Sequence, residues 1–236
     1  MKKNYILLIL ITVSYFAKSQ AYYKNALIFD ANAGLEIYNT SYSYELKNSN
    51  NQIFDTTTTD KAANTNFSFG LEYGLHKHLG VGARVKINNY ITGKDSITHV
   101  KPTASSNDIM AFINYHPLKM LPVLDLVLGT EFGYSGLTYN SHASDYSKTL
   151  PDVIITGKGF YGSVYINPRF YIKRFGFNVK LYAPFVNYKN LTTNNPELNN
   201  YYTITKWKGV PGWGLSAGIQ FRFLKIVSKA INVVTP

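Results

Sequence analysis

Three groups of residues in this chain have types and spacings that can support chemistry. Residues 157–162 match the GxGxxG pattern, whose glycines allow a backbone to approach a dinucleotide pyrophosphate closely. His76 and His78 are two residues apart, so a strand would place both imidazoles on one side, where they can contact a metal ion. His142 lies beside Ser144 and Asp145, and these are the residue types of a hydrolase triad.

The sequence context argues against all three sites. A dinucleotide site needs a helix after its glycines, whereas residues 157–162 follow a polar stretch and open an amphipathic strand. His76, His78 and His116 lie beside short turns, so we interpret them as solvated turn residues. A serine, a histidine and an aspartate often share one polar loop by chance. We therefore expect no catalytic residue, no cofactor and no metal ion, with a lipid-modifying enzyme that uses His142 as an alternative.

A larger set of charged residues alternates with apolar residues and is balanced between acids and bases. Unpaired charges are costly to bury, so we expect these side chains to pair in a network if their face is enclosed. The set consists of Asp30, Glu36, Glu72, Arg84, Lys86, Asp108, Glu131, Arg169, Lys180 and Arg222.

Residues 66–91 show the kind of element that must position these charges. Large apolar residues such as Phe67 and Val81 alternate with glycine or charged residues such as Glu72 and Arg84. A polar segment at residues 76–78 interrupts the alternation. Period-2 alternation on both sides of a polar turn predicts a β-hairpin with one apolar face.

The rest of the chain repeats this pattern. We predict eight strands: residues 27–38, the two strands of the 66–91 hairpin, and residues 108–116, 123–137, 158–172, 175–186 and 212–223. Long polar loops at residues 42–65, 93–106, 139–156 and 188–211 alternate with short turns. This order predicts an eight-stranded antiparallel up-and-down transmembrane β-barrel with four long extracellular loops and short periplasmic turns. Strand one should pair with strand eight, and Pro168 should mark a bulge or a bend.

The two faces decide how such a barrel is oriented. Residues such as Gly70, Gly129 and Gly133 lie on the charged face and would leave a soluble exterior bare, but they suit a narrow interior. We therefore expect the apolar face to meet lipid, with a secreted β-sandwich or a soluble barrel as alternatives. Aromatic residues near strand ends should form the two interfacial girdles: Tyr73, Tyr90, Tyr115, Tyr134, Phe170, Trp213 and Phe223.

The termini and composition indicate export. Residues 1–19 have a basic start, an apolar run and small residues before Gln20, which predicts a cleaved secretory signal peptide. The absence of cysteine excludes disulfides and thiolate sites. The formal net charge is +11, but the basic residues are scattered, so we expect no nucleic-acid partner.

With this signal, eight strands and the hairpin GLEYGLHKHLGVGARV, the chain resembles the small outer-membrane β-barrel proteins of Bacteroidota, the OmpA-like or porin-like family that includes the PorT type. The resemblance implies a barrel over residues 20–223. It also implies that residues 214–223, which end in Phe223, direct insertion by the barrel-assembly machinery. The chain departs from many such barrels in residues 224–236, which we expect to form a periplasmic tail.

The resemblance constrains function only broadly, because some members of the family serve in protein secretion. We expect a non-enzymatic outer-membrane protein that is structural or that binds a protein partner through its loops or its tail. An accessory role in a secretion or assembly complex is one form of this expectation. A narrow porin-like channel and a lipid-modifying enzyme are the alternatives.

Overall fold

The structure is a computed structural model, and it describes residues 22–47, 52–94, 99–117, 123–149, 151–195 and 202–223. These residues form eight strands and one short 3-10 helix, η1 (Ala143–Asp145). The strands are β1 (Leu27–Lys47), β2 (Ile53–His76), β3 (Leu79–Tyr90), β4 (Thr103–Tyr115), β5 (Leu124–Asn140), β6 (Ile154–Ile172), β7 (Phe175–Thr193) and β8 (Tyr202–Phe223).

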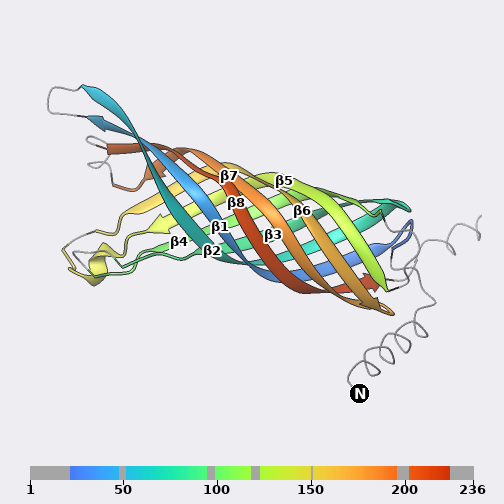
Figure 1. Cartoon of the computed structure of the whole chain (residues 1–236). Coiled ribbons are helices and arrows are strands. Elements are labelled where there is room, and N and C mark those ends of the chain that lie inside the picture. Colours follow the sequence, from blue (N-terminus) through green and yellow to red (C-terminus); the bar gives the residue numbers. More distant parts are fainter. Residues whose placement is uncertain are drawn as a thin grey trace, which may run out of the picture.

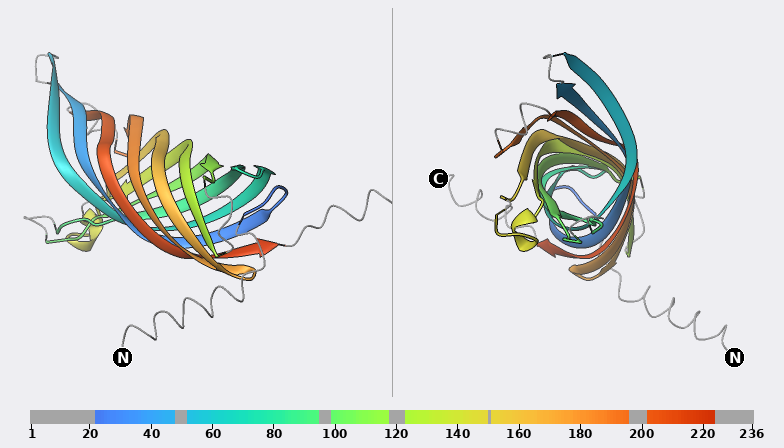
Figure 2. Two further views of the ribbon diagram at one scale, coloured as in Figure 1. Left: turned by 45° about the vertical axis from the view of Figure 1, so that its right-hand side comes forward. Right: turned by 90° about the vertical axis from the view of Figure 1, so that its left-hand side faces the viewer.

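The strands close into one antiparallel barrel, in which each strand pairs with its neighbours in sequence (Figure 1). The barrel closes where β1 pairs with β8. This pairing extends from Leu27 opposite Phe223 at one end to Leu46 opposite Tyr202 at the other. The view along the barrel in Figure 2 shows the resulting ring. Because a closed sheet has no free edge in lipid, this arrangement satisfies the backbone of every spanning strand. The predicted eight-stranded up-and-down barrel is confirmed.

The two faces of the wall have opposite chemistry. Large apolar side chains point outward and are exposed, including Leu35, Phe67, Ile109, Phe177 and Ile219. The alternate residues point inward and are mostly polar or charged. An outward apolar band around a polar interior is the arrangement of a transmembrane barrel, so the outer face is the lipid-facing one.

Glycines on the inner face allow close packing between neighbouring strands. A Cβ atom added at Gly133 would lie 2.0 Å from the carbonyl oxygen of Ile109, and one added at Gly218 would lie 2.2 Å from that of Ala31. Both contacts are with backbone, which cannot move aside. The eight-stranded interior is therefore filled to the point where some positions accept only glycine.

The structure corrects the predicted loops at residues 42–65 and 188–211. Most of residues 42–65 belongs to β1 and β2, which remain paired from Leu27 opposite Tyr73 to Lys47 opposite Ile53. Most of residues 188–211 belongs to β7 and β8. The polar composition was misleading because β-branched threonines at residues 56–59 suit an exposed strand as well as a loop. The β1–β2 hairpin consequently rises beyond the rest of the wall (Figure 2).

The short turns lie at the opposite end. Two residues connect β2 to β3, and two connect β6 to β7, where Lys173 adopts a φ of 59°. Of the bulge or bend predicted at Pro168, the bulge is wrong, because the β6–β7 register is the same on both sides of this residue. Register irregularities occur elsewhere: the β6–β7 pairing shifts between Thr156 and Lys158, and both β1 and β7 change register against β8 between Gly209 and Gly214.

Two predicted segments lie outside the described residues. These are the signal peptide at residues 1–19 and the periplasmic tail at residues 224–236, and both stay predictions. Within the described part of the chain, no helix is long and apolar enough to cross a membrane.

Candidate functional site

The barrel interior near the short turns holds a buried cluster around Glu72. One carboxylate oxygen of Glu72 accepts hydrogen bonds from Arg169 Nη1 and Asn114 Nδ2, each at 2.7 Å. The other oxygen lies 2.8 Å from His116 Nε2. His116 Nδ1 in turn lies 2.8 Å from Asp125, and its ring stacks on Tyr22 with centroids 3.4 Å apart. Four strands and the segment before β1 are thus joined through the lumen.

The middle of the lumen is organised around Arg84. Its guanidinium lies 3.2 Å from Asp30 and also pairs with Glu131. Lys180 Nζ donates to Glu131 at 2.7 Å, and Ser163 donates to the same carboxylate at 2.9 Å. These partners come from β1, β3, β5, β6 and β7. The two cations and two carboxylates of this cluster are paired across the lumen, which offsets the cost of removing them from water.

The third cluster lies farther toward the long hairpin, around Lys86. Its ammonium lies 2.7 Å from Glu36 and 3.3 Å from Asp108. It also lies 3.4 Å from the ring centroid of Tyr161, which is a cation–π contact. Tyr38 donates to Glu36 at 2.5 Å, so neutral groups complete the shell of the carboxylate.

The structure brings together nine of the ten charged residues predicted to pair inside the barrel: Asp30, Glu36, Glu72, Arg84, Lys86, Asp108, Glu131, Arg169 and Lys180. The tenth, Arg222, is buried but donates to the carbonyl oxygen of Lys173 at the β6–β7 turn. Sequence reasoning missed Asp125 as a member.

His116 is a correction. We expected a solvated turn residue, but its side chain is only 1% exposed and bridges two carboxylates. It continues the inward positions Asn114 and Phe112 of β4 beyond the end of the strand, and that alternation was the available signal.

Beyond the Lys86 cluster, on the side of the long β1–β2 hairpin, the lumen is lined by aromatic rather than charged side chains. Trp207 is 6% exposed, and its ring packs against Tyr188, Tyr90 and Tyr42 with centroid separations of 5.3, 5.8 and 6.1 Å. A cavity of about 660 Å³ opens on this aromatic floor. Its walls include Leu137, Ile155, Leu191, Thr192 and the charged pair of neighbours Asp60 and Lys61. We call this space the mouth cavity.

Tyr90 is a second correction, because we expected it in an aromatic girdle. It shares the inward face of β3 with Arg84 and Lys86 and lines the mouth cavity. The other six predicted girdle residues point outward and are exposed: Tyr73, Tyr115, Tyr134, Phe170, Trp213 and Phe223.

The three groups first considered for chemistry do not assemble sites. Residues 157–162 lie within β6, so no helix follows them as a dinucleotide site requires. Nε2 of His142 lies 2.8 Å from Thr103 Oγ1, while the backbone amide of Ser144 donates to Asp152. In the described ranges, no cluster of three or more histidine, aspartate or glutamate side chains can hold a metal ion.

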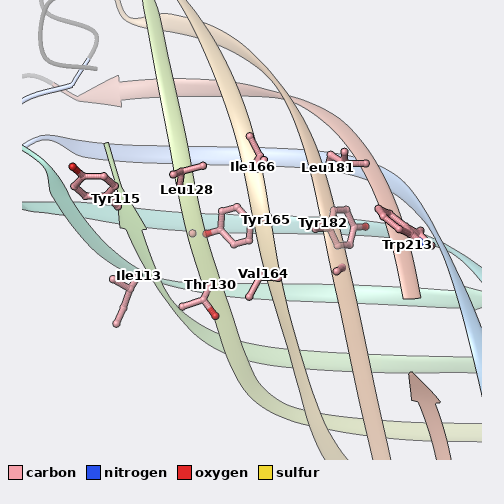
Figure 3. Close-up of a pocket in the computed structure, with 12 residues that line it drawn as sticks. Ile113, Tyr115, Leu128, Thr130, Val164, Tyr165, Ile166, Leu181, Tyr182 and Trp213 are labelled. Atoms are coloured by element: carbon pink, nitrogen blue, oxygen red, sulfur yellow. The ribbon is translucent and has the colours of Figure 1, made fainter. Parts of the chain in front are cut away.

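An open hollow of about 570 Å³ lies on the outer wall (Figure 3). Its lining comes from β4 to β8 and is almost entirely apolar, with Val164, Ile166, Leu181 and Trp213 among the residues that Figure 3 labels. We call it the outer hollow. Because the outer face meets lipid, hydrocarbon chains are its natural content.

Comparisons with known proteins show the fold. The outer membrane protein OprG from Pseudomonas aeruginosa superposes with a TM-score of 0.56 at 13% identity, over 87% of this chain and 99% of that one. The fold is that of a small outer-membrane β-barrel. Neisserial surface protein A matches at 11% identity with a TM-score of 0.49, over 85% of this chain and all of that one. No family model and no curated protein matches the chain.

Proposed function

We propose that this outer-membrane β-barrel stands in the bacterial outer membrane as a binding protein, and that it neither conducts solutes nor catalyses a reaction. The observation that carries the proposal is the order of layers in the lumen. Ion-paired clusters around Glu72, Arg84 and Lys86 fill the barrel, and the mouth cavity lies directly above them on a floor of Trp207 and Tyr90. Such a barrel can bind a partner at the mouth cavity, but its filled lumen leaves little space for solutes to cross the membrane.

The mouth cavity suits a partner that presents an apolar or aromatic group. Its volume of about 660 Å³ lies within the range of roughly 300–1,000 Å³ that is common for ligand pockets. Aromatic residues supply most of the floor, while Asp60 and Lys61 place both signs of charge at the wall. An apolar body with a polar end therefore matches the cavity. An accessory role in a larger complex is compatible with this, with the partner entering from the outside.

The chain contains two tryptophans, which makes a direct test possible. Trp213→Phe removes the lipid-facing tryptophan, so that Trp207 at the mouth cavity is the only tryptophan of the chain whose fluorescence is measured. The probe is a brominated fatty acid added to this variant in nanodiscs, because bromine quenches a nearby indole. We expect saturable quenching of Trp207 at concentrations well below those that saturate the lipid.

Two matched substitutions on β4 complete the test. Ala104 lines the mouth cavity, so Ala104→Phe should abolish saturable quenching by filling the space. Ala111 is exposed on the lipid-facing side of the same strand, so Ala111→Phe should leave quenching unchanged. Quenching that is not saturable, or that Ala104→Phe leaves unaltered, would exclude the mouth cavity as the binding site.

A further inference from the structure

A row of lysines crosses the outer wall at the extracellular end of the apolar band. Lys158 of β6 lies directly opposite Lys189 of β7, and Lys189 lies directly opposite Lys206 of β8. Lys208 lies two residues after Lys206 on the same face of β8. The charges of Lys208 and Lys189 both interact with that of Lys206. We call these residues the lysine row. Strands are spaced about 4.8 Å apart, so the first three Cα positions fall within about 10 Å.

This arrangement is unfavourable without a partner. Like charges that face each other across neighbouring strands destabilise a sheet. In the described part of the chain, none of these lysines forms a salt bridge. On the next strand, Lys206 and Lys208 face Ser43 and Ser41, which are neutral hydrogen-bonding groups. The row thus presents several donors and a concentrated positive charge to whatever lies against the wall.

The depth of the row indicates what lies there. On β6, Lys158 lies two residues before the exposed Phe160, and on β7, Lys189 lies four residues after the exposed Phe185. Apolar side chains continue from these positions toward the short turns. The lysines therefore stand where the hydrocarbon region ends, at the level of the headgroups of the outer leaflet.

The outer hollow lies below the row on the same strands. From Lys158 to Val164, the chain descends about 20 Å along β6 at ~3.3 Å per residue. A strand tilt of about 40° turns this path into a depth of about 15 Å. The hydrocarbon core is about 30 Å thick, so a depth of about 15 Å equals the hydrocarbon thickness of one leaflet. A lipid that places its headgroup on the lysines can lay an acyl chain in the hollow.

We propose that the outer wall of β6–β8 binds a phosphorylated lipid of the outer leaflet, of the lipid A class. Its phosphate contacts Lys158, Lys189 and Lys206, and an acyl chain occupies the outer hollow beneath them. The site is separate from the mouth cavity, because the lysines lie on the outer face and the cavity lies inside. It therefore requires the membrane location but not the binding role proposed above.

The test compares two triple variants with equal loss of charge. The first is Lys158→Ala/Lys189→Ala/Lys206→Ala, and the control is Lys94→Ala/Lys101→Ala/Lys148→Ala, whose residues are exposed and lie outside the strands. Purified protein in detergent is titrated with diphosphorylated lipid A and followed by native mass spectrometry. We expect the control to bind like the wild type and the first variant to bind at least about tenfold more weakly, a difference of about 1.4 kcal/mol.

Further arms identify the bound group. Dephosphorylated lipid A should bind weakly to the wild type, and inorganic phosphate at equal concentration should not displace the lipid. Ala183→Phe, which narrows the outer hollow, should weaken binding while the lysine row stays intact. A heat-modifiable gel shift confirms that each variant is folded. Equal binding by the two triple variants, equal binding of dephosphorylated lipid, or displacement by phosphate alone would each overturn the proposal.

Discussion

Lys86 Nζ lies 2.7 Å from Glu36 Oε1, although their strands, β3 and β1, are not neighbours in the barrel wall. The pair therefore links the wall through the lumen. Lys86→Met leaves Glu36 and Asp108 without their cation, and breaking a buried pair in this way costs about 3–5 kcal/mol. We expect a loss of this size in the free energy of unfolding, measured by urea denaturation in lipid vesicles.

Two variants control this prediction. Lys148→Met makes the same change on the exposed loop between β5 and β6 and should leave stability unchanged. Lys86→Met/Glu36→Gln removes one of the stranded charges and should recover part of the loss. A single Lys86→Met variant as stable as the wild type would show that the pair contributes nothing.

Gly133 and Gly136 of β5 provide a second matched comparison. A Cβ atom at Gly133 would meet the Ile109 carbonyl oxygen at 2.0 Å, whereas the nearest atom at Gly136 is 3.7 Å away in the Tyr134 ring. Gly133→Ala should force β4 and β5 apart and reduce the heat-modifiable folded fraction on unboiled gels. Gly136→Ala should fold like the wild type. Equal behaviour of the two alanines would contradict the close packing of the inner face.

The filled lumen leads to a prediction about conductance. Clusters around Glu72, Arg84 and Lys86 succeed one another along the axis, so ions meet paired charges at each level. We expect no discrete conductance steps from the purified protein in planar bilayers. Glu36→Ala/Lys86→Ala removes one cluster without changing net charge, yet two clusters remain, so this variant should also be silent. Steady steps from the wild type would favour the narrow channel instead.

The sequence predicted the barrel and its orientation because alternation sets both at once. Successive side chains of a strand point to opposite faces. Once glycines and charged residues were found at alternate positions, all residues at those positions could be assigned to the barrel interior. Charged partners from strands far apart in sequence, such as Arg169 with Glu72, were expected to pair as a group. Their individual partners were not predictable, since these depend on the three-dimensional register of the closed barrel.

The errors arose where residue type was given more weight than position. Tyr90 follows Arg84, Lys86 and Asn88 on the inward face, yet its aromatic ring and its place near a strand end favoured a girdle role. The polar residues 56–59 were interpreted as a loop although β1 pairs with them throughout. The lysine row was invisible for another reason, because its members are far apart in sequence and meet only through strand register.

His116 provides the last prediction, because its two nitrogens join Glu72 and Asp125, each at 2.8 Å. His116→Phe keeps a ring that can stack on Tyr22 but leaves both carboxylates without this donor. Leaving buried groups unsatisfied costs about 1–3 kcal/mol, and more when they are charged. We expect the free energy of unfolding in lipid vesicles to fall by at least about 2 kcal/mol.

His76 is the matched control, because it is exposed at the neighbouring turn and faces neither carboxylate. His76→Phe should therefore leave the free energy of unfolding unchanged. His116→Gln, which retains a side-chain donor, should lose less stability than His116→Phe. If the two phenylalanine variants unfold at the same urea concentration, the bridge between Glu72 and Asp125 does not stabilise the barrel. The aromatic stacking on Tyr22 would then be the whole contribution of this residue.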